Sequence, residues 1–347
     1  MNTYLTIKEE RDWNYFITRS LRYDAYHLWQ YHAIDSAGEP VMFVYLKDDL
    51  FIALPLIKRK IADSSWFDFA SVYGYVGPVS NQEFADITDD IVSDLQMSFL
   101  EFMKSEQSVS VFSRLHPFIN QHNLLDKIGG VIGNGKTVYV DLTVPHEEQE
   151  SHYDRKLAKQ IRNLRKKNYD IIDSSDKQAI RLFSEMYTEN MTRVAATGNY
   201  FFQEEYFRNL LEKNQGTSKL LMVYDNGVPI GGALILYSND IIRQHLSATS
   251  ANYLKESPSK LITDEVSLLG RRLGAKYYHM GGGVGGREDS LYKFKASFSK
   301  LTLDDYTWRF IADHNAYNSL VELRGLSKNT ESDFFPLYRS KIAEVVH

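Results

Sequence analysis

The sequence contains no cysteine, which excludes disulfides, thiolate metal sites and a cysteine nucleophile together. It also lacks any segment that approaches the roughly 18 uncharged apolar residues of a membrane helix. The N-terminus, MNTYLTIKEERDWNY, has no apolar run behind a basic start. We therefore expect a cytoplasmic protein with no export signal and no membrane span.

The sequence has no excess of positive charge, since 40 Lys and Arg face 45 Asp and Glu and the formal net charge is -5 at pH 7. This balance argues against a broad basic surface, and we expect no DNA partner. The sequence shows no H-E-x-x-H, no paired metal ligands, no G-x-S-x-G and no P-loop lysine motif. We therefore predict no metal site and no serine-hydrolase chemistry.

What is present suits a soluble protein of two domains, with 347 residues, 43% of them hydrophobic and 24% charged. Residues 41–57 and 220–236 each give two apolar runs joined by a polar turn, as a β-hairpin does. Each hairpin is followed by a strand, a helix and a short strand, over 66–75, 83–104 and 109–112, and over 240–248, 259–273 and 275–280. We predict an α+β fold of two tandem domains, 1–150 and 151–347, each with a mixed, mostly antiparallel sheet flanked by helices.

Between these domains, residues 151–168 predict an amphipathic helix. Leu157, Ile161 and Leu164 recur at helical spacing, and the segment from Arg155 to Lys167 holds seven cations and no carboxylate. One interpretation is a solvated surface helix. The other is a site for a polyanion, such as a tRNA backbone or the pyrophosphate of a nucleotide or coenzyme A, and it makes three cations candidate donor-binding residues: Arg155, Lys159 and Arg162.

Residues 279–295, HMGGGVGGREDSLYKFK, concentrate five glycines within six positions. Gly281, Gly283 and Gly286 satisfy the dinucleotide spacing G-x-G-x-x-G, but Glu288 and Asp289 would repel phosphates at the start of the following helix. One or two glycines would suffice for a turn. Five favour a loop whose backbone closely approaches a ligand, with a structural turn as the alternative.

The helix after this loop has a predicted apolar stripe of Leu291, Phe294 and Phe298. Lys295 falls beside the stripe and Lys293 on the opposite side, in solvent. Two interpretations of Lys295 remain open: its ammonium reaches into a cleft, or it is a snorkelling lysine whose stem packs while its charge finds water.

Other polar and aromatic clusters are less specific. The stretch YGYVGP, residues 73–78, could line a pocket or form a tight turn. Arg243, His245, Ser247 and Thr249 alternate onto one strand face, where His245 serves either in the reaction or as a structural hydrogen-bonding residue. A helix beginning near Pro258 could hold an anion at its N-terminus.

The C-terminal pieces resemble the FemABX-like acyltransferases of the GNAT superfamily. In that family a strand with H-L-S precedes a tyrosine and a helix begun by proline, and G-G-G leads to D-S-L-x-x-F-K-x-x-F. Here these motifs correspond to His245–Ser247, Tyr253, Pro258, Gly281–Gly283 and residues 289–298. YGYVGP, the basic helix from Arg155, YVDLT at 139–143 and MYTENMTRVAATGNYFF at 186–202 are similar to the same family.

The resemblance implies two GNAT-like domains with a substrate cleft between them, and transfer of an acyl or aminoacyl group to an amine. The implied donor is acyl-CoA or aminoacyl-tRNA, and the implied acceptor is a small-molecule or lipid-linked amine of cell-envelope biogenesis, such as a peptidoglycan precursor. tRNA is therefore a further candidate partner. The sequence lacks both the coiled-coil insertion of some tRNA-dependent members and the [RQ]-x-x-G-x-[GA] loop of ordinary GNAT enzymes, which leaves the donor open.

The resulting site hypothesis places Lys295 at the reaction centre, with His245, Asp289 and Glu288 as candidate proton acceptors. The candidate substrate-binding residues are Tyr73, Tyr75, Arg193, Tyr253, Gly281, Gly282, Gly283, Phe294 and Phe298. The alternative function is a non-catalytic protein that binds a nucleotide sugar or RNA through the basic helix 155–167.

Overall fold

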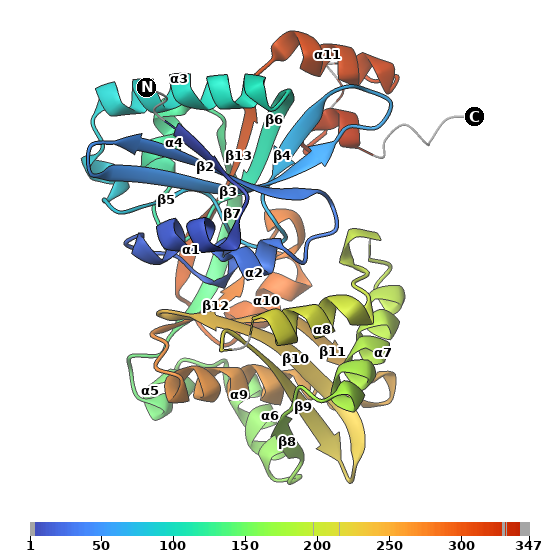
Figure 1. The fold of residues 1–347 in the computed structure, drawn as a ribbon. Coiled ribbons are helices and arrows are strands. Elements are labelled where there is room, and N and C mark those ends of the chain that lie inside the picture. The colour runs from blue at the N-terminus through green and yellow to red at the C-terminus, as the bar shows by residue number, and fades with distance from the viewer. Residues whose placement is uncertain (1–3, 197, 215, 328–329, 331, 341–347) are drawn as a thin grey trace. The chain divides into compact units, whose positions relative to one another are not determined.

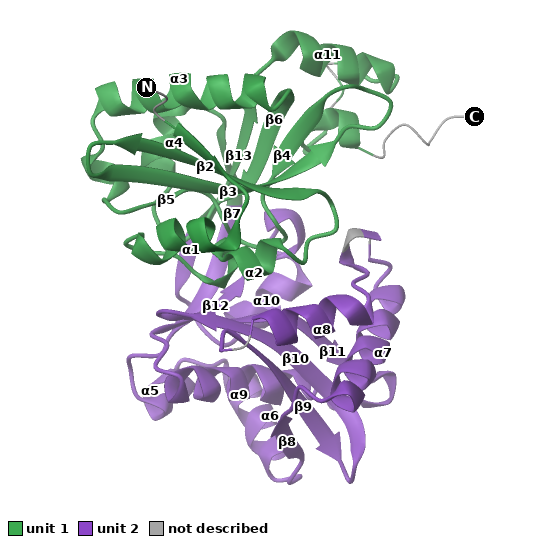
Figure 2. Cartoon of the chain, viewed as in Figure 1, with its two compact units in different colours: residues 1–134, 304–347 green, residues 135–303 purple. Residues whose placement is uncertain are grey.

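The computed structural model describes residues 4–196, 198–214, 216–327, 330 and 332–340 (Figure 1). The chain forms two compact units, one of residues 1–134 and 304–347 and the other of residues 135–303 (Figure 2). This division differs from the predicted boundary at residue 150, and residues 304–347 belong to the first unit instead of the second. The reason is that a strand near the C-terminus pairs with a strand of the first unit.

The first unit contains a mixed, mostly antiparallel sheet in the order β1-β2-β3-β4-β6-β13, with β5 paired to β3. Among its described strands, β4 and β6 pair in parallel and the other pairs are antiparallel. Its strands are β1 (Tyr4–Ile7), β2 (Glu39–Lys47), β3 (Leu50–Lys60), β4 (Phe67–Ala70), β5 (Val79–Ser80), β6 (Ser108–Arg114) and β13 (Thr302–Ile311). Its α-helices are α1 (Glu10–Arg19), α2 (Trp29–His32), α3 (Asp89–Ser105), α4 (His122–Ile128) and α11 (His314–Leu323).

Aromatic side chains dominate the core of the first unit. The face of α3 that packs on the sheet contributes Phe99 and Phe102, and Phe102 stacks on Phe69 of β4 with ring centroids 5.2 Å apart. Trp308 of β13 lies 5.4 Å from Phe99 and is only 1% exposed. Large buried rings of this kind contribute strongly to stability, so β13 completes this core as well as the sheet.

The C-terminal segment is also fixed to the first unit by a buried carboxylate. Asp68 of β4 is fully buried and accepts hydrogen bonds from Arg59 Nε at 2.8 Å, Tyr338 OH at 3.0 Å and Arg339 Nε at 2.6 Å. A buried carboxylate is stable only when it is paired, and two of these three partners come from residues 338 and 339.

The second unit contains a sheet in the order β7-β12-β11-β10-β9-β8, in which only β11 and β12 are parallel. Its strands are β7 (Val131–Asp141, which enters this unit at Gly135), β8 (Asp170–Asp173), β9 (Ser218–Asp225), β10 (Val228–Ser238), β11 (Ile241–Thr249) and β12 (Tyr277–Gly281). Its α-helices are α5 (His146–Ser151), α6 (Arg155–Arg165), α7 (Lys177–Arg193), α8 (Glu204–Lys213), α9 (Ser259–Arg272) and α10 (Ser290–Ala296).

Helices cover both faces of this second sheet. The adjacent residues Gln244 and His245 of β11 have hydrogen-bond partners on opposite faces of the sheet. Gln244 accepts a hydrogen bond from Thr263 of α9, whereas His245 bonds with Tyr206 of α8. Helices α9 and α8 therefore lie on opposite sides of the sheet, as Figure 1 also shows.

The predicted α+β class and both predicted hairpins are confirmed. The turn between β2 and β3 contains Asp48 at φ +52°, and the turn between β9 and β10 contains Asn226 and Gly227 at φ +49° and +80°. Two successive positive φ angles are the requirement of a type I′ turn, which explains the Asn-Gly pair. Within the described residues no helix is both long and apolar enough to cross a bilayer.

Candidate active site

The glycine-rich loop joins β12 to α10 in the second unit, and the chain itself occupies the space that several of its glycines leave. A Cβ on Gly283 would lie 1.9 Å from the carbonyl oxygen of Arg287, and one on Gly282 would lie 2.8 Å from that of Lys136. A Cβ on Gly135, in β7, would lie 2.1 Å from the carbonyl oxygen of Gly286. The close backbone approaches seen here are thus contacts between loop and chain.

The same loop also turns sharply. Gly281, Gly285 and Gly286 have φ values of +77°, +62° and +76°, a region that glycine enters without strain. Gly281 lies at the register shift in the pairing of β12 with β7. The structural turn is therefore confirmed, and other glycines of the loop allow close packing against the chain itself, while the approach of this backbone to a ligand stays a prediction.

Asp289 closes this loop as the N-cap of α10. Its carboxylate accepts hydrogen bonds from the backbone N–H of Tyr292 at 2.9 Å and of Val284 at 3.0 Å. These two backbone donors lower the pKa of the Asp289 carboxyl. A carboxylate that is held in its charged form by fixed donors is a poor proton acceptor, so the geometry assigns Asp289 a capping role.

Lys295 follows on α10 and turns back toward the loop. Its half-buried Nζ donates a hydrogen bond to the carbonyl oxygen of Gly282 at 2.6 Å, while Lys293 is exposed as predicted. Phe294 and Phe298 pack edge to face with centroids 5.4 Å apart, and Phe298 is 1% exposed. The Lys295 ammonium is thus bound to the Gly282 carbonyl at the edge of the apolar core that contains Phe298.

One element of the predicted stripe is wrong, since Leu291 is 43% exposed. Tyr292 is buried in its place and packs in the core of the second unit with Phe298. Helix α10 has only seven residues, and the loop that Asp289 caps fixes its orientation. A stripe extrapolated at 100° per residue does not include this constraint.

His245 occupies an irregular position in β11. Leu234 pairs with Leu246 and Ile235 with Gln244, so His245 is the extra residue of a β-bulge and interrupts the alternation predicted for this strand. Its Nε2 hydrogen-bonds the hydroxyl of Tyr206 at 2.8 Å. Burial, with a smaller contribution from Arg243, lowers the pKa of His245 to about 3, so the imidazole is neutral at physiological pH.

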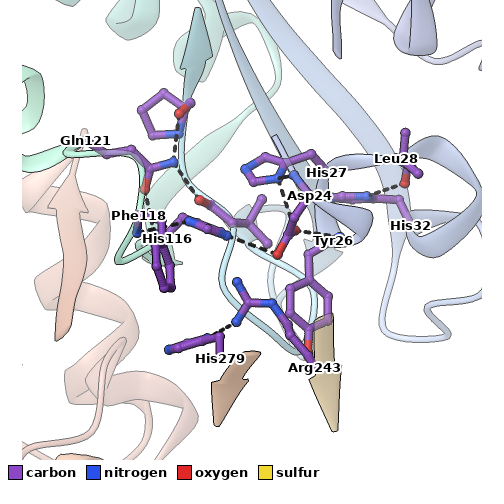
Figure 3. Close-up of polar contacts among 12 residues, drawn as sticks. Asp24, Tyr26, His27, Leu28, His32, His116, Phe118, Gln121, Arg243 and His279 are labelled. Atoms are coloured by element: carbon purple, nitrogen blue, oxygen red, sulfur yellow. Dashed lines mark hydrogen bonds and ion pairs between the residues drawn. The ribbon is translucent and has the colours of Figure 1, made fainter. Parts of the chain in front are cut away.

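Arg243, two residues earlier on β11, is buried beside His279 of the neighbouring strand β12. Its guanidinium hydrogen-bonds Nδ1 of His279, and the two side chains are 4% and 2% exposed (Figure 3). The parallel register of β11 and β12 brings these residues level, since Ile242 pairs with Tyr278. Such a buried cation in a strand facing α8 adds to the polar cluster around His245.

In the first unit, the YGYVGP stretch forms a tight loop held by Gln121. The Gln121 amide donates to the carbonyl oxygens of Val76 at 2.6 Å and Pro78 at 2.7 Å, and its Oε1 accepts from the backbone N–H of His116 (Figure 3). Tyr75 is buried with the Arg114 guanidinium 4.1 Å above its ring, whereas Tyr73 is 41% exposed. Only Tyr73 therefore presents much of its side chain at the surface of this unit.

A buried histidine cluster supports the same region of the first unit. Asp24 Oδ2 lies 3.0 Å from Nε2 of His116, and Asp24 Oδ1 accepts from the backbone N–H of Tyr26 (Figure 3). His27 and His32 are fully buried nearby, and burial lowers the pKa of His32 to about 3. Because Phe118 N–H donates to Nδ1 of His116, the His116 proton lies on Nε2 and points at the Asp24 carboxylate.

Helix α6 has the predicted amphipathic character. Leu157, Ile161 and Leu164 are buried, and the candidate donor-binding residues are exposed on the other face: Arg155, Lys159 and Arg162. Arg165 pairs with Asp264 and Glu265, and Lys167 pairs with Glu256. Among the described residues, Arg155, Lys156, Lys159 and Arg162 form no ion pair. The C-terminal end of the cationic run is thus neutralised and its N-terminal part is not.

The two remaining predicted substrate residues lie on the surface of the second unit. Arg193 is at the end of α7, donates to Asn190 Oδ1 at 3.2 Å and borders a shallow groove of about 670 Å³. This groove is lined by Ser184, Glu185, Thr188, Glu189, Thr192 and Arg193. Tyr253 is half-buried, and its hydroxyl donates to Asp225 at 2.9 Å.

Comparisons with known proteins agree with this architecture. Residues 151–295 match the family model of the acetyltransferase (GNAT) domain. The crystal structure of FemX superposes with a TM-score of 0.68 at 13% identity, over 92% of this chain and 99% of FemX. Residues 151–295 therefore correspond to a GNAT domain, and the chain as a whole has a FemX-like fold.

Two further structures share this fold. L-PGS from Bacillus licheniformis has a TM-score of 0.56 at 13% identity, over 87% of this chain and 92% of L-PGS. The C-terminal domain of a putative lysylphosphatidylglycerol synthetase from Agrobacterium fabrum has a TM-score of 0.52 at 13% identity, over 86% of this chain and 92% of that domain. A search among curated proteins found no relative by sequence. The match to the acetyltransferase (GNAT) domain supports an acyltransferase.

The GNAT domain holds most of the predicted site. Gly281–Gly283, Asp289 and Lys295 meet around one loop, and Lys295 is the last residue that the family model matches. His245, Arg193 and Tyr253 lie on other elements of the same domain, and Tyr73 and Tyr75 belong to the first unit. The structure thus brings the glycine loop, Asp289 and Lys295 into contact, whereas Arg193 and Tyr253 hydrogen-bond to Asn190 and Asp225.

Two polar residues that hold predicted site residues in place, one in each unit, were not predicted from the sequence. Tyr206 is 39 residues from His245 and reaches it only because α8 folds over β11. Gln121 clamps a loop 43 to 45 residues before it. Neither residue lies in a recognisable motif. The polar residues of the strand that carries His245 indicate that a polar partner is needed there, but they do not identify it.

Proposed function

We propose that the chain is an N-acyltransferase that moves an acyl or aminoacyl group from a thioester or an aminoacyl-tRNA to an amine. The observation that carries this proposal is the half-buried Lys295 ammonium, held 2.6 Å from the Gly282 carbonyl at the edge of a GNAT domain. We place the reaction in the cytoplasm, where both kinds of donor are made.

Lys295 would act on the negative charge that develops on the donor carbonyl. When an amine attacks this carbonyl, a C–N bond forms, the oxygen becomes an oxyanion, and the bond to the sulfur or ribose oxygen then breaks. The ammonium would donate a hydrogen bond to this oxyanion and so stabilise the transition state. Alignment of donor and acceptor would supply much of the remaining reduction of the barrier.

The amine must also lose a proton during the reaction. Asp289 is occupied as a helix cap, and the low pKa of His245 makes its imidazole a weak base. We propose that His245 positions the hydroxyl of Tyr206 and that water or the substrate takes the proton, with exposed Glu288 as the remaining candidate.

The donor is proposed to bind through α6. Arg155, Lys159 and Arg162 are exposed cations, and none of them has a carboxylate partner among the described residues. Phosphate groups occur in both coenzyme A and tRNA, so either donor would gain from this surface. The lysylphosphatidylglycerol synthetase neighbour supports an aminoacyl donor, and we propose an amine of the cell envelope, such as a peptidoglycan or lipid-linked precursor, as acceptor.

The test is mass spectrometry of a panel of amine acceptors after incubation with the protein and either acetyl-CoA or charged tRNA. We expect Lys295→Met to lower the rate by about 10²- to 10³-fold, the range for losing one oxyanion donor. Lys293→Met is the matched control, because this exposed lysine lies on the same helix and should leave the rate unchanged. Equal rates in both variants would remove Lys295 from the mechanism.

The alternative is a non-catalytic protein that binds a nucleotide sugar or RNA. The cations of α6 that lack partners favour this second candidate as well. Failure of both donors to give a mass shift, together with RNA binding that weakens steeply with salt, would support it. One small ligand would give a shallow salt dependence instead.

A further inference from the structure

We propose that His146, Glu150 and Asp264 form a binding site for a transition-metal ion of the Zn²⁺ type within the second unit. One possible ligand atom from each of these residues lies within 4.8 Å of the other two. His146 and Glu150 come from α5, and Asp264 comes from α9. The sequence could not show this group, because His146 and Asp264 are 118 residues apart.

The geometry suits a small tetrahedral ion. His146 and Glu150 are four residues apart on one helix, so their side chains share a face. Nε2 of His146 lies 3.4 Å from Oδ1 of Asp264. Two ligands bound to zinc at its usual bond lengths in tetrahedral geometry lie roughly 3.4 Å apart. These two atoms therefore need little movement to share one ion.

The surroundings hold Asp264 in the orientation of a ligand. Its side chain is fully buried, Oδ1 accepts from the hydroxyl of Tyr153 at 2.8 Å, and Oδ2 accepts from Arg165 at 2.5 Å. Carboxylates that bind metals are commonly oriented by hydrogen bonds of this kind from a second layer of residues. The second lone-pair direction of Oδ1 faces Nε2 of His146, and an ion between these two atoms would replace their present hydrogen bond.

The charge balance also calls for a cation. Within the described residues, the Glu150 side chain makes no hydrogen bond and no ion pair, although its carboxylate lies beside that of Asp264. The Arg165 guanidinium is the nearby neutralising group, and it is shared between Asp264 and Glu265. A divalent ion would compensate the remaining negative charge.

The mixture of ligands selects the kind of ion. One imidazole with two carboxylates is a set found around Zn²⁺, whereas Mg²⁺ and Ca²⁺ prefer oxygen ligands alone. Three protein ligands leave the fourth tetrahedral position for water. Because α5 and α9 would share the ion, its binding would join the start of the second unit to its central helix and stabilise that unit.

The experiment is a calorimetric titration of chelator-treated full-length protein with ZnCl₂. We expect one bound ion per chain, with at least a tenfold loss of affinity in His146→Gln and in Glu150→Gln. His152→Gln is the matched control, because His152 is an exposed histidine just beyond the end of α5 that is outside the cluster, and its variant should bind like the wild type. MgCl₂ should not compete.

Cobalt gives a second measurement, since tetrahedral Co²⁺ with nitrogen and oxygen ligands has an intense visible absorption that octahedral Co²⁺ in water lacks. We expect this absorption in the wild type and its loss in both ligand variants, each checked for its fold by circular dichroism. No stoichiometric zinc binding would overturn the proposal. Equal affinity in the ligand variants and the wild type, or a loss only in His152→Gln, would equally overturn it.

Discussion

At the scale of single residues, most polar side chains singled out from the sequence have defined hydrogen-bond partners. Asp289 caps a helix, His245 holds Tyr206, and Lys295 lies on a loop carbonyl. The pKa values separate their roles, because those of Asp289 and His245 are both lowered, for opposite electrostatic reasons. Fixed donors stabilise the charged carboxylate, whereas burial disfavours the charged imidazole. Lys295 is half-buried and its ammonium is held by a hydrogen bond, and the exposed Lys293 on the same helix provides a comparison.

His32 gives a residue-scale prediction about acid stability. Burial lowers its pKa from 6.5 to about 3 in the folded state. Above pH 6.5 both states are neutral, so stability is unaffected. Between about pH 6.5 and 3 the unfolded chain takes up a proton that the folded chain excludes, and stability falls by about 1.4 kcal/mol per pH unit.

We expect the free energy of unfolding of His32→Gln to fall less steeply as the pH is lowered from 6.5 to 3, with a slope smaller by about 1.4 kcal/mol per pH unit, which corresponds to one proton. All four tryptophans lie in the first unit with His32, so their fluorescence during urea unfolding follows that unit: Trp13, Trp29, Trp66 and Trp308. His314→Gln is the control, since this exposed histidine of the same unit should leave the slope unchanged. An unchanged slope in His32→Gln would show that His32 titrates equally in both states.

At the scale of elements, α6 presents its charge in two parts. The C-terminal end is joined to α9 by the pairs of Arg165 with Asp264 and Glu265, while the N-terminal part meets solvent. The pairing anchors the helix, and the buried leucine and isoleucine stripe holds it against the unit. An anchored helix keeps exposed cations in fixed positions, which reduces the entropy lost when a phosphate chain binds.

We therefore expect the triple change Arg155→Ala, Lys159→Ala and Arg162→Ala to raise the KM for the donor about tenfold with kcat unchanged, at roughly 0.5 kcal/mol per contact. If the donor is a tRNA, the slope of log affinity against log salt should fall by about 0.7 to 0.9 per contact. Lys177, Arg181 and Lys213 are exposed cations of α7 and α8 for a control triple change. If the two triple changes had equal effects, α6 would not be a specific donor site, and its cations would contribute only to the overall charge of the protein.

The elements also show what the sequence could predict. Both hairpins, the helices α3, α6 and α9 and the α+β class followed from alternating or helical apolar patterns with strong turn signals. The single irregular positions did not follow, such as the bulge at His245 and the exposed Leu291. These positions depend on pairing partners and caps distant in sequence or fixed by tertiary packing, which periodicity does not record.

At the scale of the whole molecule, the first unit is made of two separate segments. Strand β13 pairs with β6, from Thr307 with Arg114 to Ile311 with Ser110, and Trp308 enters the core. Residues 1–134 alone would therefore leave β6 without this neighbour and the core without Trp308. The second unit is continuous from 135 to 303.

We expect residues 135–303 expressed alone to be folded and residues 1–134 alone to aggregate. Circular dichroism and size-exclusion chromatography of the two fragments are the measurements. A polypeptide in which a short glycine and serine linker connects residues 1–134 to residues 304–340 should form a folded first unit. Well-folded 1–134 on its own would show that β13 is dispensable.

The split first unit also sets an order of events during synthesis. Residues 135–303 leave the ribosome before most of β13 does, so the second unit can begin to fold while β6 still lacks its partner strand. Until Trp308 emerges, the nascent first unit carries an open sheet edge and an unfilled core. Synonymous codons that slow translation just before residue 302 would lengthen the time for which the first unit lacks β13. We therefore expect such codons to lower the yield of folded protein in a cell, although they change no amino acid.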